Sequence, residues 1–385
     1  MDMDSKKLRV AFFSEDFSRQ AKGTAIVIQK LAEQFLTDFS GQIELTLIRK
    51  EGFCGHPLVK KMRNIEIKVY KTPIFSTLIS YFIFFIKNKE EFDAIIFNRN
   101  VYPGFWLLNA KKYILFIYDA PVNQIYKENL SLENRLIYFF LKYIGKYFLD
   151  AMIAVSNDAK SGIIEYLNLN PSRVFTVYGG VGDEYRLFSD QEKTDAQAVL
   201  KEKYGIITPY ILAVSRLEPH KNITTIIDSF FILKNQYNIT HKLVIVGGRH
   251  LSGHTKMIEE KIANLNLSKD IIITSYIEEN DMPAVYNLAD LLIFPSLLEG
   301  FGLPVAEAMK CGTPVIASNL PVMAEVADGA AILVDSYNAE LFATNALKIL
   351  KNQKLEQELV RKGLERSKVF SWKNSVEQLF RIIKL

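Results

Sequence analysis

Two glutamates bracket the stretch of this chain whose residue types are best suited to chemistry. Glu299 and Glu307 have seven residues between them, and Gly-Phe-Gly-Leu-Pro occupies positions 300–304. An apolar run at 291–295 predicts a buried strand before them, and the glycines permit a sharp loop. Pro304 suits the first turn of a helix, so the stretch predicts a strand, a tight loop and a helix. Glu299 then lies just before the helix start and Glu307 one turn inside it.

The start of this predicted helix is a candidate anion site. The backbone N–H groups of Phe301, Gly302 and Leu303 would face outward at the positive end of the helix. Helix starts of this kind bind phosphate or sugar oxygens. Carboxylates that accept hydrogen bonds from hydroxyls, beside amides that bind phosphate, suit a nucleotide sugar.

This stretch resembles the signature of the family 4 retaining glycosyltransferases, and the likeness is strongest over residues 205–335. Members of that family have the GT-B fold, an α/β architecture of two Rossmann-like doubly wound domains that face each other across a cleft. The resemblance implies that Glu299 contacts hydroxyls of the donor sugar and that Glu307 holds the ribose. The backbone of 301–303 would meet the sugar and the distal phosphate. Taken singly, Glu299 is better explained as a charge that complements the helix dipole and Glu307 as a solvated helix residue, and only the complete string favours the binding site.

Two cations follow the first predicted strand of the same half. The segment Ser-Arg-Leu-Glu-Pro-His-Lys-Asn at 215–222 separates a strand at 211–215 from a helix that starts near Ile223. The resemblance implies that Arg216 and Lys221 grip the donor diphosphate. The chemistry agrees, because a guanidinium offers paired hydrogen bonds and an ammonium offers a movable charge to a departing diphosphate. Gly248, Tyr276 and Ile277, which follow two further strands, would line the pocket for the nucleotide base.

The first half carries three more candidates. Gly23 lies between an opening strand and an amphipathic helix, where it is a helix-start glycine first and a phosphate contact second. Tyr118 and Asp119 follow a strand at 113–117, where family members often have His-Asp and the His faces the primary hydroxyl of the donor sugar. Tyr118 in place of that His leaves open a 6-deoxy sugar, and packing at the strand end explains it equally well. Asp119 is the better polar candidate.

Length and composition fit two globular domains. The chain has 385 residues, 49% of them hydrophobic and 23% charged. Alternating strands and helices predict two doubly wound units, residues 1–188 and residues 189–369. The resemblance implies that a last helix at 370–385 crosses back onto the first unit, that the first unit binds the acceptor and that the second binds the nucleotide sugar. We predict strands at 8–14, 43–48, 65–70, 94–98, 113–117, 152–155, 174–177, 211–215, 243–246, 271–274, 291–294, 315–317 and 331–334.

Two segments of the first half are unusually aromatic. The run at 74–86 is apolar for thirteen residues, which is too short to span a bilayer, and residues 136–149 mix aromatic residues with lysines. Residues 1–188 carry 25 Lys and Arg against 20 Asp and Glu, a net charge of +5. These segments are either helices buried in a packed domain or a surface that adsorbs to an anionic membrane. No concentrated basic stripe or binding motif indicates nucleic acid as a partner.

Metal ions and cofactors have little support in the sequence. The Asp-x-Asp pair that holds a metal in the other glycosyltransferase architecture occurs once, as Asp2 and Asp4, near the beginning of the sequence. The histidines and the two cysteines, Cys54 and Cys311, show no metal-binding spacing. We therefore expect no metal and no cofactor beyond a UDP- or GDP-sugar donor. The first residues lack an apolar signal segment, so we expect a cytoplasmic protein.

The resemblance implies a retaining hexosyltransferase with a lipid-linked or oligosaccharide acceptor, in the synthesis of a bacterial surface polysaccharide such as O-antigen, capsule or exopolysaccharide. Two alternatives stay open. One is a non-catalytic scaffold subunit that binds a sugar nucleotide, for which Tyr118 is the sequence argument. The other is a GT-B enzyme that epimerises a nucleotide sugar.

Overall fold

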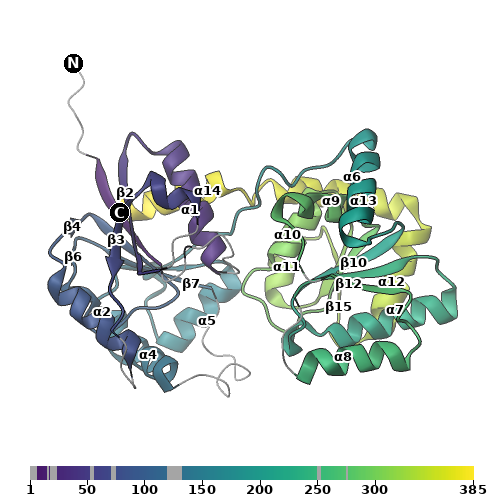
Figure 1. Ribbon diagram of the computed structural model, residues 1–385, viewed down its shortest axis with the longest axis horizontal. Coiled ribbons are helices and arrows are strands. Elements are labelled where there is room, and N and C mark those ends of the chain that lie inside the picture. The colour runs from purple at the N-terminus through teal and green to yellow at the C-terminus, as the bar shows by residue number, and fades with distance from the viewer. Residues whose placement is uncertain are drawn as a thin grey trace. The chain divides into compact units, whose positions relative to one another are not determined.

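A computed structural model of the chain describes residues 7–14, 17, 24–52, 56–70, 75–118, 132–248, 253–274 and 276–385. The chain divides into two compact units, Met1–Gly180 with Trp372–Leu385 and Val181–Ser371. Each unit is built on a parallel sheet with helices on its faces (Figure 1). Gly23 and Asp119 lie outside the described residues.

The described part of the first unit contains a seven-stranded parallel sheet in the order β3-β2-β1-β5-β7-β8-β9. Its strands are β1 (Leu8–Phe13), β2 (Ile43–Lys50), β3 (Arg63–Ile67), β5 (Ala94–Asn98), β7 (Tyr113–Ile117), β8 (Ala151–Ala154) and β9 (Val174–Thr176). The short strands β4 (Glu91–Phe92) and β6 (Asn109–Ala110) pair with each other. The helices are α1 (Thr24–Asp38), α2 (Ser76–Lys87), α4 (Leu132–Tyr143), α5 (Asn157–Leu167) and α14 (Trp372–Lys384). Short 3₁₀ turns are η1 (Pro57–Lys61), η2 (Phe105–Leu107), η3 (Gly145–Tyr147) and η4 (Pro171–Arg173).

Helices cover both faces of this sheet because side chains alternate along each strand. Phe13 of β1 lies in an apolar cluster with Tyr81 and Phe85 of α2 and with side chains of α4 and α5. Phe12, on the opposite face, packs against Phe35 of α1 with ring centroids 6.0 Å apart. Buried on both faces, the strand is almost wholly apolar, as parallel sheets require.

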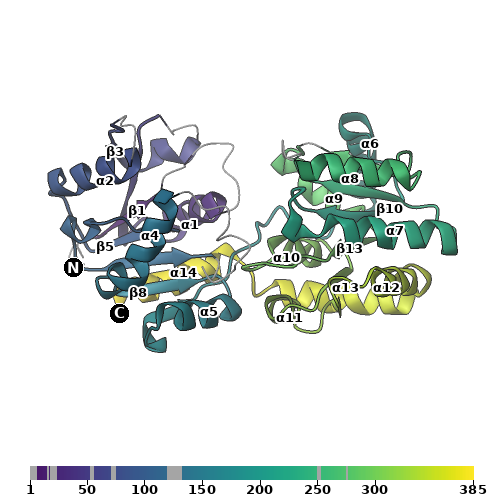
Figure 2. The ribbon, with the colours of Figure 1, turned by 90° about the horizontal axis from the view of Figure 1, so that it is seen from below.

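The last helix belongs to the first unit, as the resemblance implied. Phe380 of α14 packs on Phe39, which follows α1, with ring centroids 4.4 Å apart, and α14 lies among elements of that unit in Figure 2. Where α14 begins, Trp372 lies so close to Gly180 that a Cβ at position 180 would be 2.4 Å from the Trp372 backbone nitrogen. A glycine at 180 is therefore a steric requirement.

In the second unit, the described residues form a six-stranded parallel sheet in the order β12-β11-β10-β13-β14-β15. Its strands are β10 (Tyr210–Val214), β11 (Lys242–Val246), β12 (Ile271–Thr274), β13 (Leu291–Phe294), β14 (Val315–Ser318) and β15 (Ile332–Val334). The helices are α6 (Asp190–Tyr204), α7 (Ile223–Tyr237), α8 (Gly253–Asn264), α9 (Met282–Asn287), α10 (Leu303–Lys310), α11 (Pro321–Ala327), α12 (Ala339–Lys351) and α13 (Gln353–Ser367), with 3₁₀ turns η5 (Pro219–Lys221) and η6 (Glu279–Asp281). Ile211 of β10 packs with Phe230 of α7 and Phe342 of α12 in one buried cluster. The neighbouring residue Tyr210 is also buried, and its hydroxyl donates to the carbonyl of Val285, which lies in α9, at 2.6 Å.

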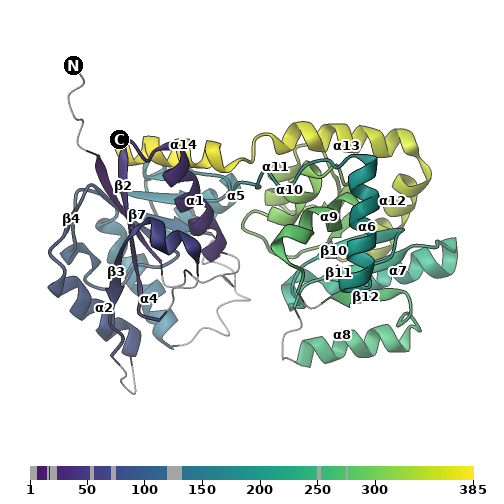
Figure 3. The same cartoon turned by 45° about the horizontal axis from the view of Figure 1, so that its top comes forward.

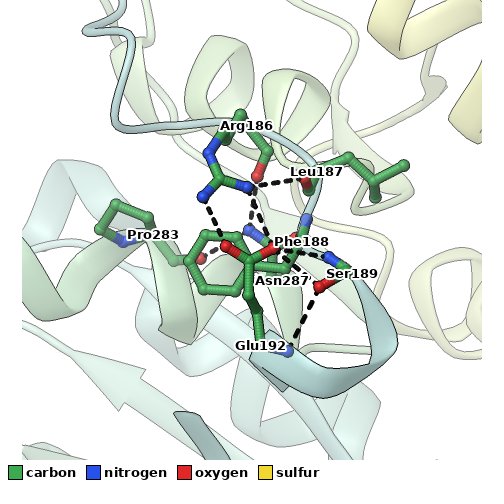
Figure 4. A network of polar contacts seen from close by, with 7 residues as sticks. All are labelled: Arg186, Leu187, Phe188, Ser189, Glu192, Pro283 and Asn287. Carbon is green, nitrogen blue, oxygen red and sulfur yellow. Dashed lines mark hydrogen bonds and ion pairs between the residues drawn. The ribbon is translucent and has the colours of Figure 1, made fainter. Parts of the chain in front are cut away.

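Residues 181–188 belong to the second unit, whereas the sequence-based boundary assigned them to the first. Lys310 of α10 donates to the carbonyls of Val181 and Gly182 at 3.0 and 2.9 Å. Farther along, the Asn287 side chain accepts from the Phe188 N–H and donates to the Arg186 carbonyl, both at 2.8 Å (Figure 4). Contacts between residues about a hundred positions apart set this boundary, and no local composition marks them.

The same network starts α6. Ser189 accepts from the backbone N–H of Glu192, and the Glu192 carboxylate accepts from the Ser189 N–H, a reciprocal capping box. The Arg186 guanidinium lies 2.5 Å from that carboxylate and holds the pKa of Glu192 at about 2, well below its usual range.

The third predicted strand is shifted toward the N-terminus. The sequence predicted 65–70, but β3 pairs with β2 over Arg63–Ile67. The next residues leave the sheet, because the N–H of Val69 donates to the Glu51 carboxylate and that of Tyr70 to the Ser80 hydroxyl. Side chains therefore satisfy backbone groups that the apolar pattern assigned to a strand.

Truncation of a buried α14 residue should destabilise the first unit. Leu379 is fully buried, and Leu379→Ala should lower the free energy of unfolding of that unit by about 3 kcal/mol through lost burial and the remaining cavity. Urea unfolding followed by circular dichroism and tryptophan fluorescence measures the change. Gln378→Ala, at the exposed neighbouring position, is the matched control. Equal stabilities of the two variants would contradict the packing of α14 on this unit.

Candidate functional site

Two loops meet at the carboxyl edge of the second sheet. Strands β10 and β13 are neighbours, although β11 and β12 lie between them in the sequence. The connections that leave β10 and β13 therefore run in opposite directions, which makes this the point of a doubly wound sheet where ligands bind. The loop after β10 carries Arg216 and Lys221, and the loop after β13 carries Glu299.

Lys221 and Glu299 form an ion pair between these loops. The Lys221 Nζ lies 2.5 Å from the Glu299 Oε1, and the side chains are 19% and 12% exposed. The Ser296 hydroxyl donates to the same oxygen at 2.7 Å. The backbones are also joined, since the Leu297 N–H donates to the His220 carbonyl at 2.8 Å. The pair is thus fixed in place by neighbours on both loops.

Asn222 is a positioning residue that the sequence analysis did not single out. Its backbone is left-handed, with φ 53°, and its buried amide donates to the carbonyls of Ser336 at 2.6 Å and Pro295 at 3.3 Å. Its side-chain oxygen accepts from Thr225 at 3.0 Å. An asparagine directly before a predicted helix is the sequence signal that could have identified it.

Arg216 is 57% exposed, and its guanidinium lies 3.0 Å from the Glu218 carboxylate of its own loop. The backbone at Gly247 lies close to the backbone at Ser215, and this contact constrains the loop. A Cβ at Gly247 would lie 1.9 Å from the carbonyl oxygen of Ser215, so a side chain at 247 would displace the residue before Arg216. Gly247 therefore shapes the loop, while its neighbour Gly248 is partly exposed at the end of the same strand.

The predicted helix start is present as α10. Gly302 precedes the helix with φ 94°, a left-handed conformation that favours glycine, and a Cβ there would also lie 2.5 Å from the terminal methyl of Met323. Leu303 and Pro304 are the first two helical residues. Proline has no N–H and the Val305 N–H donates to the Gly302 carbonyl at 3.0 Å, so the Leu303 N–H is the first-turn donor with no acceptor within the helix. Phe301 is buried with its ring edge-on to Phe370, centroids 5.2 Å apart.

Glu307 lies one turn into α10 and is only partly accessible to solvent. The Tyr286 hydroxyl of α9 donates to its carboxylate at 2.6 Å. Burial raises the pKa of Glu307 to about 7, and the charges of Glu184 and Glu279 add to the rise, whereas the hydrogen bond from Tyr286 opposes it. The carboxylate is therefore a hydrogen-bonding group poised between its charged and neutral forms near neutral pH.

The remaining base-pocket candidates differ in exposure. Tyr276 is exposed and Ile277 is buried. No described contact joins either residue to the Lys221–Glu299 pair.

The first sheet has a corresponding point between β1 and β5, which are neighbours although β2 and β3 lie between them in sequence. The Asn98 amide donates to the Ser14 hydroxyl at 3.4 Å across this point. Among the described residues, the Asn98 side-chain oxygen and the Tyr118 hydroxyl are buried without a hydrogen-bond partner. Burial raises the pKa of Tyr118, so its hydroxyl is protonated at neutral pH. The sequence analysis did not single out Asn98, although a polar residue at the carboxyl end of an apolar strand could have identified it.

Within the described part of the chain, no cluster of three or more His, Cys, Asp or Glu side chains is arranged to hold a metal ion. Asp2 and Asp4 lie outside this part of the chain. None of the described helices combines the length and the apolar character needed to cross a bilayer. Cys311 is buried, and that burial raises the pKa of its thiol, which fits a packing role.

Comparison with known families gives a match across the second unit. The sequence model described as "Glycosyl transferases group 1" matches residues 168–366. In Escherichia coli, the serotype-specific mannosyltransferase WbdA is 31% identical over 230 residues, which cover 59% of this chain and 28% of WbdA. The O-antigen chain mannosyltransferase B of the same organism is 26% identical over 234 residues, 61% of this chain and 60% of that protein. The chain thus covers less than two thirds of either relative.

Comparison with solved structures covers nearly the whole chain. The crystal structure of Anabaena Alr3699/HepE in complex with UDP and glucose matches 98% of this chain and 99% of its own, with a TM-score of 0.77 and 15% identity. At that identity the likeness is one of fold. It confirms the two-unit α/β architecture of the GT-B type predicted from the sequence.

The raised pKa of Glu307 makes stability depend on pH in a defined direction. Below pH 4.5 the carboxyl is protonated in both folded and unfolded chains. Between about 4.5 and 7 the folded state keeps a proton that the unfolded state has lost, so stability falls as pH rises. The unfolding free energy of the wild type minus that of Glu307→Gln should therefore fall by about 2 kcal/mol from pH 4.5 to pH 8. Urea titrations at several pH values measure it, and a difference independent of pH would contradict the burial of this carboxyl.

Proposed function

Because this chain belongs to the glycosyl transferases group 1 family, we propose that it is a retaining, metal-independent hexosyltransferase. Its donor is a nucleotide-diphosphate sugar, and its acceptor is a lipid-linked or oligosaccharide chain of a bacterial surface polysaccharide. The observation that carries this proposal is the Lys221–Glu299 ion pair at 2.5 Å, held between two loops beside the start of α10.

Mannose is the first sugar to test. Both E. coli relatives named above are mannosyltransferases. Mannose and glucose differ at the C2 hydroxyl, so a hydrogen-bonded carboxylate near the sugar can discriminate between them. We assign that contact to Glu299. UDP and GDP remain the two candidate nucleotides, since HepE, which shares the fold, was solved with UDP and glucose.

In this proposal the second unit neutralises the leaving group. A lysine ammonium has three donors, so Lys221 can keep its bond to Glu299 and still bind a phosphate oxygen. The exposed Arg216 guanidinium and the backbone N–H groups of Gly302 and Leu303 at the start of α10 supply further donors to the diphosphate. Glu307, with its hydroxyl-bonding carboxylate, holds the ribose. Charge that develops on the diphosphate is thereby met by groups already in place.

The transfer then needs no covalent enzyme intermediate. The bond between the sugar C1 and the diphosphate oxygen breaks, and the acceptor hydroxyl oxygen bonds to C1 on the same face. The acceptor proton passes to an oxygen of the departing diphosphate, so configuration at C1 is retained.

Removal of the ion pair should abolish transfer without unfolding the chain. Glu299→Gln and Lys221→Met should each lower kcat/KM at least about 100-fold, because fixed charges near developing charge are lost. The assay follows release of nucleoside diphosphate in the presence of a membrane extract as acceptor source.

The matched control is the more exposed ion pair of Lys261 with Asp228, 2.7 Å apart in the same unit. Lys261→Met and Asp228→Asn should leave kcat/KM unchanged. Full activity of the Glu299 variant would refute the site. Release of a new sugar nucleotide without any acceptor would instead identify an epimerase.

Donor binding can be tested without turnover. A ligand present at 100 times its Kd adds about 2.7 kcal/mol to folded-state stability, so it raises the melting temperature by several degrees. We expect GDP-mannose to give a larger shift than UDP-glucose, and Arg216→Ala to reduce the shift. No shift with any GDP- or UDP-sugar would contradict a nucleotide-sugar site.

A further inference from the structure

Exposed apolar side chains gather on one part of the first unit. Of twenty large hydrophobic side chains exposed in the described residues, eleven lie between Ile79 and Phe148. They come from α2, η2, α4 and η3. Phe139 is 60% exposed and Tyr147 is 70% exposed. We call this surface the aromatic face and define it by Phe82, Ile86, Leu107, Leu136, Phe139 and Tyr147.

The aromatic face is continuous across these elements. A Cβ at Gly104 would lie 2.9 Å from the Phe82 ring of α2 and 3.5 Å from a methyl of Leu107 in η2. The surface extends from η2 to η3, because the ring of Trp106 in η2 stacks on the ring of Phe148, the residue after η3, with centroids 4.2 Å apart. Helices α2 and α4 lie side by side in Figures 1 and 3 and contribute to the same buried cluster.

Each of the two helices buries one side and exposes the other. In α2, Tyr81 and Phe85 are core residues, whereas Phe82 and Ile86 are exposed. In α4, Ile137 and Leu141 are buried, whereas Leu136 and Phe139 are exposed. The expectation of helices packed into the domain therefore holds for one side of each helix, and the other side presents an apolar surface.

Positive charge borders this face. Lys87 and Lys89 are exposed at the end of α2. The Lys142 ammonium lies 4.3 Å from the centroid of the Tyr166 ring and the Lys146 ammonium 5.3 Å from that of the Tyr147 ring, which are cation–π contacts. The sequences of α2, η2, α4 and η3 include a single acidic residue, Glu133.

We propose that the aromatic face docks the first unit onto an anionic membrane surface. Apolar and aromatic groups would enter the boundary between headgroups and acyl chains, and the bordering lysines would bind anionic headgroups. With 12 residues each, α2 and α4 lie in the interface rather than cross it. A second copy of the chain fits less well, because pairing two such faces would bring lysines against lysines.

The test is flotation of the full chain with phosphatidylcholine vesicles that contain one quarter phosphatidylglycerol, compared with phosphatidylcholine alone. The chain should bind the anionic vesicles at least tenfold more tightly, and 0.5 M salt should weaken that binding. Phe82→Ser with Phe139→Ser should weaken it at least tenfold. Lys87→Glu with Lys89→Glu, which leaves every buried residue unchanged, should also weaken it tenfold or more.

Matched controls come from the second unit. Tyr337→Ser with Leu341→Ser replaces two exposed apolar side chains, and Lys348→Glu with Lys351→Glu reverses two exposed charges in the last turn of a helix. Both controls should bind like the wild type. Equal binding to neutral vesicles, or unchanged binding of both aromatic-face variants, would overturn the proposal. The proposal would also be overturned if the wild type bound no vesicles but formed a dimer in light scattering, and if only the aromatic-face variants lost that dimer. The assay contains no sugar nucleotide, so its outcome is independent of the proposed transfer activity.

Discussion

The divergence of connections between β10 and β13 is the constraint on which the second unit's site depends. Parallel strands end at a common edge, and at this one position the two following loops leave in opposite directions. Arg216 and Lys221 arrive from one side and Glu299 from the other. The Lys221–Glu299 ion pair then joins the two loops, and both charged groups are largely shielded from water. Asn222, bound to backbone carbonyls beyond β13 and β15, keeps the two loops in register.

Much of this arrangement was predictable because short, continuous stretches of the sequence determine it. Apolar runs such as Ala94–Asn98 and Leu291–Phe294 form strands at the predicted bounds, since a buried parallel strand is apolar throughout. The start of α10 was predictable because Gly302 permits the left-handed residue before the helix and Pro304 suits the first helical turn. Both features need only the residues beside them.

Other features depend on partners far away in the sequence. The raised pKa of Glu307 follows from burial, which the hydrogen bond from Tyr286 opposes, and from the charge of Glu184, and no spacing connects these residues to it. The assignment of residues 181–188 to the second unit rests on hydrogen bonds with Lys310 and Asn287, which lie about a hundred positions or more later in the sequence. The aromatic face was ambiguous for a similar reason. An aromatic run shows that a helix has apolar sides, but only the fold shows which side lacks a covering.

Helix α10 is engaged at both of its ends. Its first turn borders the proposed diphosphate site, and Lys310 in its last turn grips the carbonyls of Val181 and Gly182, where the chain enters the second unit. The N–H of Val181 also donates to the carbonyl of Phe370, where the chain leaves that unit. A single helix therefore connects the proposed diphosphate site to the two segments by which the chain enters and leaves the second unit.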